Sequence, residues 1–123
     1  MVSLFFQSVI LLCVLKNALC FDCNMVHVEG EERGAVTLLQ SDVRTIYKLT
    51  VYTGNKWQEI FQSGKMTNYG KDRYKGRLSI SNSRDVTMTN LRMRDAGTYK
   101  AITVEYDMVL IECYQLKVTR RAP

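Results

Sequence analysis

Apolar and polar residues alternate along this chain in a series of short segments, each ended by turn residues, and this limits the folds open to it. The stretch at 46–52, for example, is rich in β-branched and aromatic side chains and precedes a turn at 53–56. Such period-two segments are typical of strands in a sandwich or barrel. No segment keeps a 3.6-residue apolar period over three turns, so we predict an all-β domain. The expected strands cover residues 26–28, 36–40, 46–52, 57–62, 78–80, 86–88, 99–105 and 111–119.

The N-terminal residues have the pattern of a signal peptide. Residues 2–15 form an apolar run that is shorter than the roughly 20 residues of a membrane span. Ala18 and Cys20 supply the small residues of a cleavage site, so the mature chain is expected to begin at Phe21. No Lys or Arg precedes the run, and a buried N-terminal helix or a signal anchor is the alternative. We predict a signal peptide at 1–20, a domain at 21–119, a short tail at 120–123, and a secreted or extracellular cell-surface location.

Composition narrows the classes of partner. No second long apolar run follows the signal peptide, so we expect no membrane span in this chain, which is then soluble or the outer part of a longer receptor. The net charge of +5 becomes +4 when Lys16 leaves with the signal peptide. A nucleic-acid-binding domain would carry a denser and more one-sided basic patch, so nucleic acid is not expected as a partner.

The residues of catalysis are scarce. His27 is the only histidine, and it lies on the first expected strand. Nucleophilic catalysis needs a histidine or another base beside its nucleophile, and a metal site needs several converging ligands. No glycine-rich phosphate loop is present either. The sequence therefore predicts a protein that is not an enzyme and has no metal or cofactor.

One motif identifies the type of β-domain. Residues 91–99 contain Asp95, Gly97 and Tyr99 at alternate positions, and this segment resembles the Asp-x-Gly-x-Tyr signature of variable-type immunoglobulin domains. The resemblance implies a Greek-key β-sandwich in which Tyr99 is the tyrosine corner and its hydroxyl bonds to the backbone upstream. Gly97 relaxes the backbone at this corner. Asp95 is expected to pair with an arginine, for which Arg77 is the first choice and Arg73 the second.

Two hallmarks of the variable-type immunoglobulin domain are missing. Ala101 stands where the strand F cysteine is expected, and the cysteine of strand B would fall near Gln40. Val51 occupies the place of the strand C tryptophan, and Trp57 comes too late in the sequence to fill it. Loss of the inter-sheet disulfide costs about 2–5 kcal/mol in a small secreted domain, so packing or another link must offset it.

Cys23 and Cys113 can supply another link. In a sandwich of this type the first strand pairs with the last, and both cysteines have outward parity when Val26, Val28 and Leu116 face the core. Two outward cysteines on adjacent strands can meet, and an even pair in a secreted chain favours one disulfide. Closing a loop of roughly 90 residues is expected to stabilise the domain by about 4–5 kcal/mol. A free thiol or an intermolecular disulfide is the alternative.

The missing inter-sheet disulfide also suggests a narrower resemblance. A domain with this corner but without that disulfide resembles the distal domain of the signalling lymphocytic activation molecule (SLAM) family. The resemblance implies binding through strands G, F, C and C′ to an immunoglobulin-type domain on an opposing cell, or to a second copy of the chain. An ordinary solvated sheet face is the alternative interpretation. Strand parity places eight residues on the candidate face: Lys48, Thr50, Tyr52, Lys100, Ile102, Val104, Gln115 and Lys117.

We therefore expect a recognition domain in immune-cell adhesion or receptor signalling. A secreted decoy or ligand that works away from a membrane is one alternative. A polyanion-binding module is another, because Lys71, Arg73, Lys75 and Arg77 form a basic cluster that suits heparin-like or phosphate ligands. That cluster has a simpler interpretation, in which the loop is solvated and Arg77 pairs with Asp95. Trp57 is either an anchor for a partner or a side chain packed on its own sheet.

Overall fold

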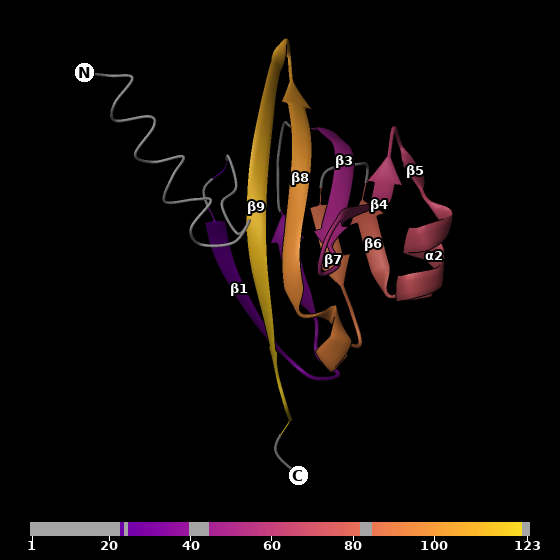
Figure 1. Cartoon of the computed structure of the whole chain (residues 1–123), viewed down its shortest axis with the longest axis vertical. Coiled ribbons are helices and arrows are strands. Elements are labelled where there is room, and N and C mark those ends of the chain that lie inside the picture. The colour runs from indigo at the N-terminus through magenta and orange to yellow at the C-terminus, as the bar shows by residue number, and fades with distance from the viewer. Residues whose placement is uncertain (1–22, 24, 40–44, 82–84, 122–123) are drawn as a thin grey trace, which may run out of the picture.

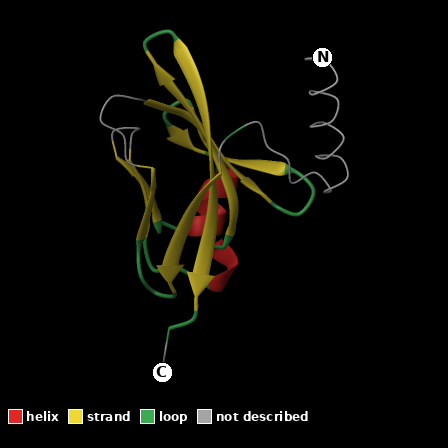
Figure 2. Cartoon of the chain, turned by 90° about the vertical axis from the view of Figure 1, so that its left-hand side faces the viewer, coloured by secondary structure: helices red, strands yellow, loops and turns green. Residues whose placement is uncertain are grey.

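Two β-sheets pack face to face in this domain (Figures 1 and 2). The computed structural model describes residues 23, 25–39, 45–81 and 85–121, so the expected signal peptide and Gln40 lie outside the described residues. The larger sheet has the strand order β1-β9-β8-β3-β4-β5, and the smaller sheet has the order β2-β7-β6. The strands are β1 (Met25–Glu31), β2 (Val36–Leu39), β3 (Thr45–Tyr52), β4 (Trp57–Gln62), β5 (Lys65–Met66), β6 (Leu78–Ser81), β7 (Asp85–Met88), β8 (Gly97–Glu105) and β9 (Met108–Thr119).

The prediction of a β-sandwich is confirmed, but the sequence pattern did not show two short helices. Helix α2 (Asn68–Tyr74) follows β5, and the 3₁₀ helix η1 (Met93–Asp95) precedes β8. Two turns are too few to give a sustained apolar period. Thr67 caps α2, since its hydroxyl accepts a 3.0 Å hydrogen bond from the Gly70 backbone N–H. A Cβ on Gly70 would lie 2.4 Å from the Ile60 carbonyl oxygen, so this close approach of α2 to β4 requires glycine.

The first and last strands pair, as expected. β1 runs parallel to β9, with Met25 opposite Cys113 and Glu31 opposite Thr119. Val28 packs against the core, but the prediction that Val26 also faces the core is wrong, because Val26 is 47% exposed. Among the described strands β1 pairs with β9 alone, so it forms one edge of the larger sheet, where Val26 is open to solvent.

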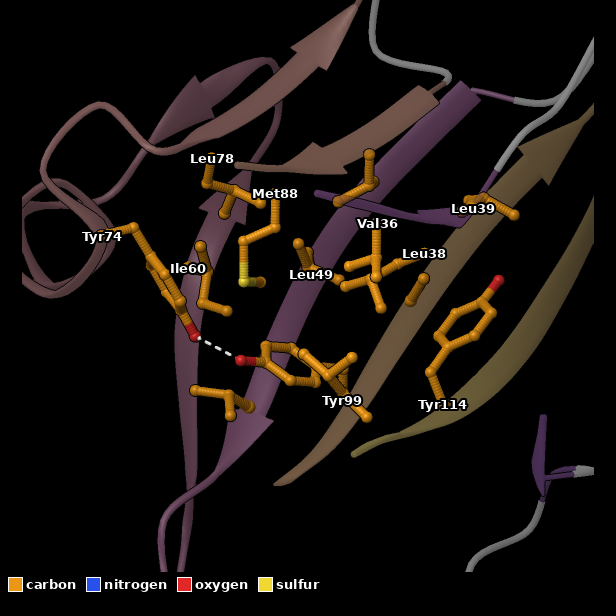
Figure 3. Close-up of a cluster of buried hydrophobic side chains, with 14 of the residues drawn as sticks. Val36, Leu38, Leu39, Leu49, Ile60, Tyr74, Leu78, Met88, Tyr99 and Tyr114 are labelled. Carbon is orange, nitrogen blue, oxygen red and sulfur yellow. Dashed lines mark hydrogen bonds between the residues drawn. The ribbon is translucent and has the colours of Figure 1, made fainter. Parts of the chain in front are cut away.

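Close packing fills the centre of the sandwich where the inter-sheet disulfide is missing (Figure 3). Ala101 is fully buried, and Val51 is 1% exposed at the site of the absent tryptophan. Large side chains from both sheets meet around them, including Leu38, Leu49 and Tyr99. Burial of apolar surface yields about 25 cal/mol per Å², so these side chains supply stability that the missing covalent link would otherwise provide.

Candidate recognition face

A buried polar network at the end of β7 and the start of β8 holds the tyrosine corner. The Tyr99 hydroxyl donates a 2.6 Å hydrogen bond to the Asp95 carbonyl oxygen and accepts one of 3.1 Å from the Tyr74 hydroxyl. Gly97 has φ +150°, a conformation that other residues rarely adopt. Burial raises the pKa of Tyr74 to about 12 and also raises the pKa of Tyr99. The network thus fixes the backbone where β8 enters the larger sheet.

Arg77 and Asp95 form the ion pair of this network. Two guanidinium nitrogens of Arg77 lie 2.6 and 3.0 Å from the two Asp95 carboxylate oxygens, and both residues are buried. The Arg92 backbone N–H also donates to the Asp95 carboxylate at 2.8 Å. The hydrogen bond with Asp95 raises the pKa of Arg77. Arg73, the second candidate partner, instead donates to the Tyr69 hydroxyl and to the Arg94 carbonyl oxygen.

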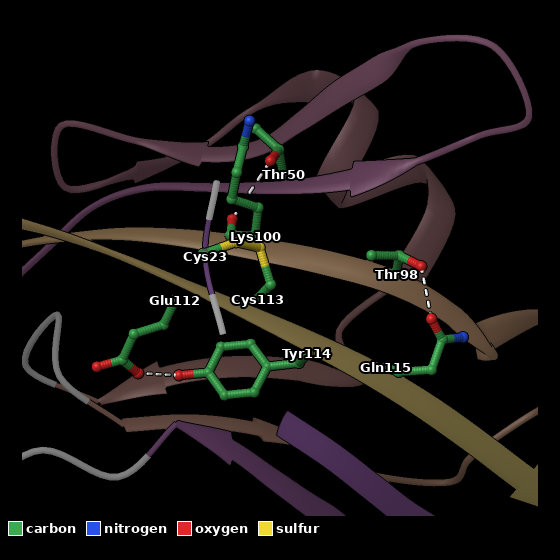
Figure 4. The surroundings of a disulfide bond; sticks show 8 residues. All are labelled: Cys23, Thr50, Thr98, Lys100, Glu112, Cys113, Tyr114 and Gln115. Atoms are coloured by element: carbon green, nitrogen blue, oxygen red, sulfur yellow. Dashed lines mark hydrogen bonds between the residues drawn. A yellow bond between two sulfur atoms is a disulfide. The ribbon is translucent and has the colours of Figure 1, made fainter. Parts of the chain in front are cut away.

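Cys23 and Cys113 form a disulfide on the outer face of the larger sheet (Figure 4), with their Cα atoms 5.9 Å apart. The neighbouring Tyr114 points into the core, so Cys113 has the outward parity expected of it. Its side chain is nevertheless fully buried. The disulfide joins the segment before β1 to the middle of β9 and covers that part of the outer face.

The structure brings only part of the predicted face together. Lys48 on β3 is directly opposite Ile102 on β8, and Lys100 and Val104 lie on the same side of β8. Thr50 shares this side but is 4% exposed, because β3 lies between β8 and β4 and the Thr50 hydroxyl bonds to the Lys100 carbonyl oxygen at 3.3 Å. The prediction of Thr50 as a contact residue is therefore wrong.

Gln115, Lys117 and Tyr52 lie further away, and Tyr52 is at the end of β3 that is remote from the hairpin, opposite Trp57. Cys113 is opposite Lys100 on the sheet, so the disulfide separates Gln115 and Lys117 from the upper part of β8. Gln115 accepts a 2.7 Å hydrogen bond from the Thr98 hydroxyl. Lys117 is exposed near the other end of β9. These two residues form a separate region of the outer face.

Sequence reasoning missed the apolar residues of β9 that lie beside Ile102 and Val104 near the β8–β9 hairpin. Val109 is opposite Val104, and Ile111 is opposite Ile102, so the four side chains share one side of the β8–β9 hairpin. Val109 is 63% exposed and Ile111 44% exposed. We call Ile102, Val104, Val109 and Ile111 the hairpin patch. Alternation on both sides of the turn at 106–107 was the signal in the sequence that could have revealed it.

Charged side chains border the hairpin patch, and two aromatic rings lie beyond them at the far end of β3 and the start of β4. The Lys48 ammonium lies 3.1 Å from the Glu59 carboxylate on β4. Lys100 lies 4.4 Å from the centre of the Trp57 ring, and the Tyr52 ring is 5.2 Å from that same ring. Trp57 therefore packs on its own sheet, the second of its two expected roles. These contacts order the polar side chains beside the hairpin patch.

The tip of the hairpin carries further exposed apolar surface. Tyr106 is 91% exposed, and Met108 is 63% exposed. The tip lies at the upper end of the domain in Figure 1. Beside it, Tyr47, Val104 and Tyr106 contribute to the lining of an open hollow, whose other side is the turn between β4 and β5. The exposed apolar surface therefore extends from the hairpin patch to the tip of the hairpin.

The described residues show little that points to chemistry. Within ranges 25–39, 45–81 and 85–121, together with residue 23, no three His, Cys, Asp or Glu side chains gather in a way that could hold a metal ion. His27 is exposed on β1, opposite Gln115. In the same described part of the chain, no helix has the length and apolar character needed to cross a bilayer.

Comparison with known proteins identifies the fold through solved structures. No protein-family model and no curated protein sequence matches the chain. CD84, described in a study of SLAM family function, is 20% identical with a TM-score of 0.53, and the match covers 80% of this chain and all of that one. The second immunoglobulin domain of the mouse polymeric immunoglobulin receptor is 17% identical, with a TM-score of 0.53 and coverage of 81% and 99%.

The N-terminal four-domain fragment of Dscam1 isoform 9.44 gives a TM-score of 0.59 at 12% identity. The match covers 83% of this chain but only 24% of the Dscam1 chain, as expected for one domain out of four. With identities this low, the comparisons establish the fold alone. The chain forms an immunoglobulin-like β-sandwich, and what it recognises has to be argued from its own surface.

Proposed function

We propose that this chain is a variable-type immunoglobulin recognition domain that acts outside the cell and binds another protein through the hairpin patch. The observation that carries the proposal is the patch itself, four β-branched side chains on one side of β8 and β9. The larger sheet supports the variable subtype, because β4 and β5 extend it beyond β3 as the additional strands of variable domains do. The disulfide supports an extracellular site of action, since such bonds persist in oxidising compartments.

The chemistry of the patch suits a protein partner. Apolar residues at the centre with polar residues at the rim are the usual anatomy of a protein–protein interface. Val109 and Ile111 supply the apolar centre, and Lys48, Lys100 and Glu59 supply the rim. Rim side chains that are already ordered by their own contacts lose less conformational entropy when a partner binds.

The proposed partner is an immunoglobulin-type domain on an opposing cell, in immune-cell adhesion or receptor signalling. The resemblance to the SLAM family, which rests on the tyrosine corner together with the missing inter-sheet disulfide, and the fold shared with CD84 support this partner class. A second copy of the chain is the other candidate. The signal peptide at 1–20, the domain at 21–119 and the tail at 120–123 remain part of the proposal. N-terminal sequencing of protein secreted by transfected cells tests the cleavage site, and Phe21 is the residue expected first.

Binding can be tested with tetramers of the mature chain on a panel of cell-surface immunoglobulin-domain ectodomains that includes the chain itself. Val109→Asp places a charge within the hairpin patch and is expected to weaken binding by about tenfold or more. Met93→Asp is the matched control, because Met93 is 40% exposed on η1, away from the hairpin. Equal binding by the two variants, or no ligand on the panel, would contradict the proposal.

A soluble decoy or ligand would use the same surface. The discriminating observation is the transcript beyond Pro123. A further domain and a membrane span encoded there favour a receptor, and a stop codon favours the soluble form. The tetramer experiment is informative in either case because it tests the hairpin patch and not the anchoring of the protein.

A further inference from the structure

A basic hollow lies at the end of the domain opposite the hairpin patch. Its cations are Arg73 on helix α2, Lys75 at the C-cap of that helix, and Arg94 on η1. β8 starts just after η1, at Gly97, and Ile102 and Val104 of the hairpin patch lie five and seven residue steps along it, so the two regions are roughly 16–23 Å apart at about 3.3 Å per residue. We call this surface the basic hollow; its lining residues are Asn68, Tyr69, Asp72, Arg73, Lys75 and Arg94.

Two arginines of the basic hollow hold each other in place. Arg73 donates to the Arg94 carbonyl oxygen at 3.0 Å, and Arg94 donates to the Arg73 carbonyl oxygen at 3.2 Å. Arg73 also donates to the Tyr69 hydroxyl at 2.9 Å. In the described part of the chain, neither guanidinium forms an ion pair with a carboxylate. Backbone oxygens thus order both groups without neutralising their charge.

The charge around the basic hollow is strongly one-sided. Three cations line it, and Asp72 is the single carboxylate among its lining residues. Two more exposed cations lie on the same elements: Lys71 is on α2, and Arg92 is the N-cap residue of η1. The structure therefore separates the basic cluster of the sequence into two parts. Arg77 is buried and neutralised by Asp95, whereas Lys71 and Lys75 are exposed and Arg73 is half-buried against Arg94, an arginine from a distant segment.

We infer that the basic hollow binds a sulfated polysaccharide. Guanidinium groups present several N–H donors in a plane and recognise oxyanions such as sulfate and phosphate groups through paired hydrogen bonds. Cations from two elements around an open hollow suit an extended chain that carries repeated anionic groups. The polar groups of Asn68, Tyr69 and Asp72 provide hydrogen-bond partners for sugar hydroxyls.

This site is independent of the proposed protein-binding function. Because the basic hollow and the hairpin patch lie at opposite ends of β8, one domain can hold a polysaccharide and a protein partner together. The polysaccharide would concentrate the protein at a surface while leaving the hairpin patch free. Failure of the polysaccharide test therefore leaves the protein-binding proposal standing, and the reverse also holds.

The test uses the mature chain with immobilised heparin at about 0.15 M salt, where interactions between exposed charges beyond about 8 Å are largely screened. The Lys75→Gln/Arg94→Gln double variant is expected to bind about tenfold more weakly. Lys71→Gln/Lys75→Gln, which leaves the bonds between Arg73 and Arg94 intact, is expected to bind about threefold more weakly. The Lys65→Gln/Lys117→Gln double variant has the same net charge as either, with both changes elsewhere, and its binding is expected to change by less than about twofold.

Competition identifies the chemistry that is recognised. Soluble heparin is expected to displace the protein, whereas desulfated heparin and hyaluronan, which carry carboxylates but no sulfates, are expected to fail. Equal losses in the hollow variants and the Lys65/Lys117 control would show nonspecific charge attraction and overturn the inference. Equal competition by desulfated heparin would overturn it as well. Binding to phosphatidylserine vesicles without binding to heparin would assign the basic hollow to membranes instead.

Discussion

Replacing Asp95 by asparagine is expected to destabilise the domain severely although it hardly changes the shape of the side chain. The carboxylate accepts three hydrogen bonds in the structure, two from the Arg77 guanidinium and one from the Arg92 backbone N–H. Asp95→Asn leaves Arg77, which is 6% exposed, as a buried and unpaired charge. Removing one partner of a buried ion pair costs about 3–5 kcal/mol.

That loss is large compared with the stability of a domain of this size, which is about 5–15 kcal/mol. At about 4–8 °C per kcal/mol for a domain of 60–100 residues, the melting temperature should fall by at least about 12 °C. Urea denaturation followed by Trp57 fluorescence measures the free energy of unfolding directly, and an unchanged slope would show that unfolding still occurs in one step.

A double-mutant cycle isolates the ion pair from the other consequences of each change. Arg77→Met removes the buried cation, and Arg77→Met/Asp95→Asn removes both charges together. The double variant should be more stable than the sum of the two single losses predicts, by at least about 2 kcal/mol. A single Asp95→Asn loss below about 1 kcal/mol, or additive losses, would refute the argument that Asp95 neutralises Arg77 in the core.

Three further predictions concern other parts of the fold. The Cys23→Ser/Cys113→Ser double variant should lose up to about 4–5 kcal/mol of unfolding free energy, because the disulfide closes a loop across 90 residues. A reductant should destabilise the wild type and leave this variant unaffected. Equal stability of the variant and the wild type would contradict the prediction. Burial favours the neutral Tyr74 hydroxyl, so between pH 10 and about 12 the free energy of unfolding should fall by about 1.4 kcal/mol per pH unit for this group. Urea titrations should show a smaller loss of stability at alkaline pH in Tyr74→Phe. An identical fall in the free energy of unfolding with pH in the two proteins would argue against a raised pKa. Gly70→Ala brings a methyl group against the Ile60 carbonyl oxygen and should cost at least about 1–3 kcal/mol in thermal or urea unfolding; a stabilised variant would show that the separation of α2 and β4 is not fixed.

The sequence was sufficient for the architecture because the patterns that specify it are local. Alternation marks which strand residues face the core, and this is a property of neighbouring positions along one strand. The segment containing Asp95, Gly97 and Tyr99 indicated the corner, which the structure builds from a hydrogen bond over four residues and a positive φ. Helix α2 escaped the same reasoning because a helix of two turns depends on its cap and on contacts with β4.

The composition of the two surfaces depended on the tertiary structure, because register and strand ends bring distant residues together. Parity placed Thr50 outward, but only the packing of neighbouring strands shows that it is covered. The hairpin patch depends on the register that sets Val109 opposite Val104. The basic hollow likewise depends on contact between α2 and η1, which are 21 residues apart at Arg73 and Arg94. The periodicity of the sequence indicates which face of a strand a side chain is on, but it does not indicate which residues lie beside that side chain in the fold.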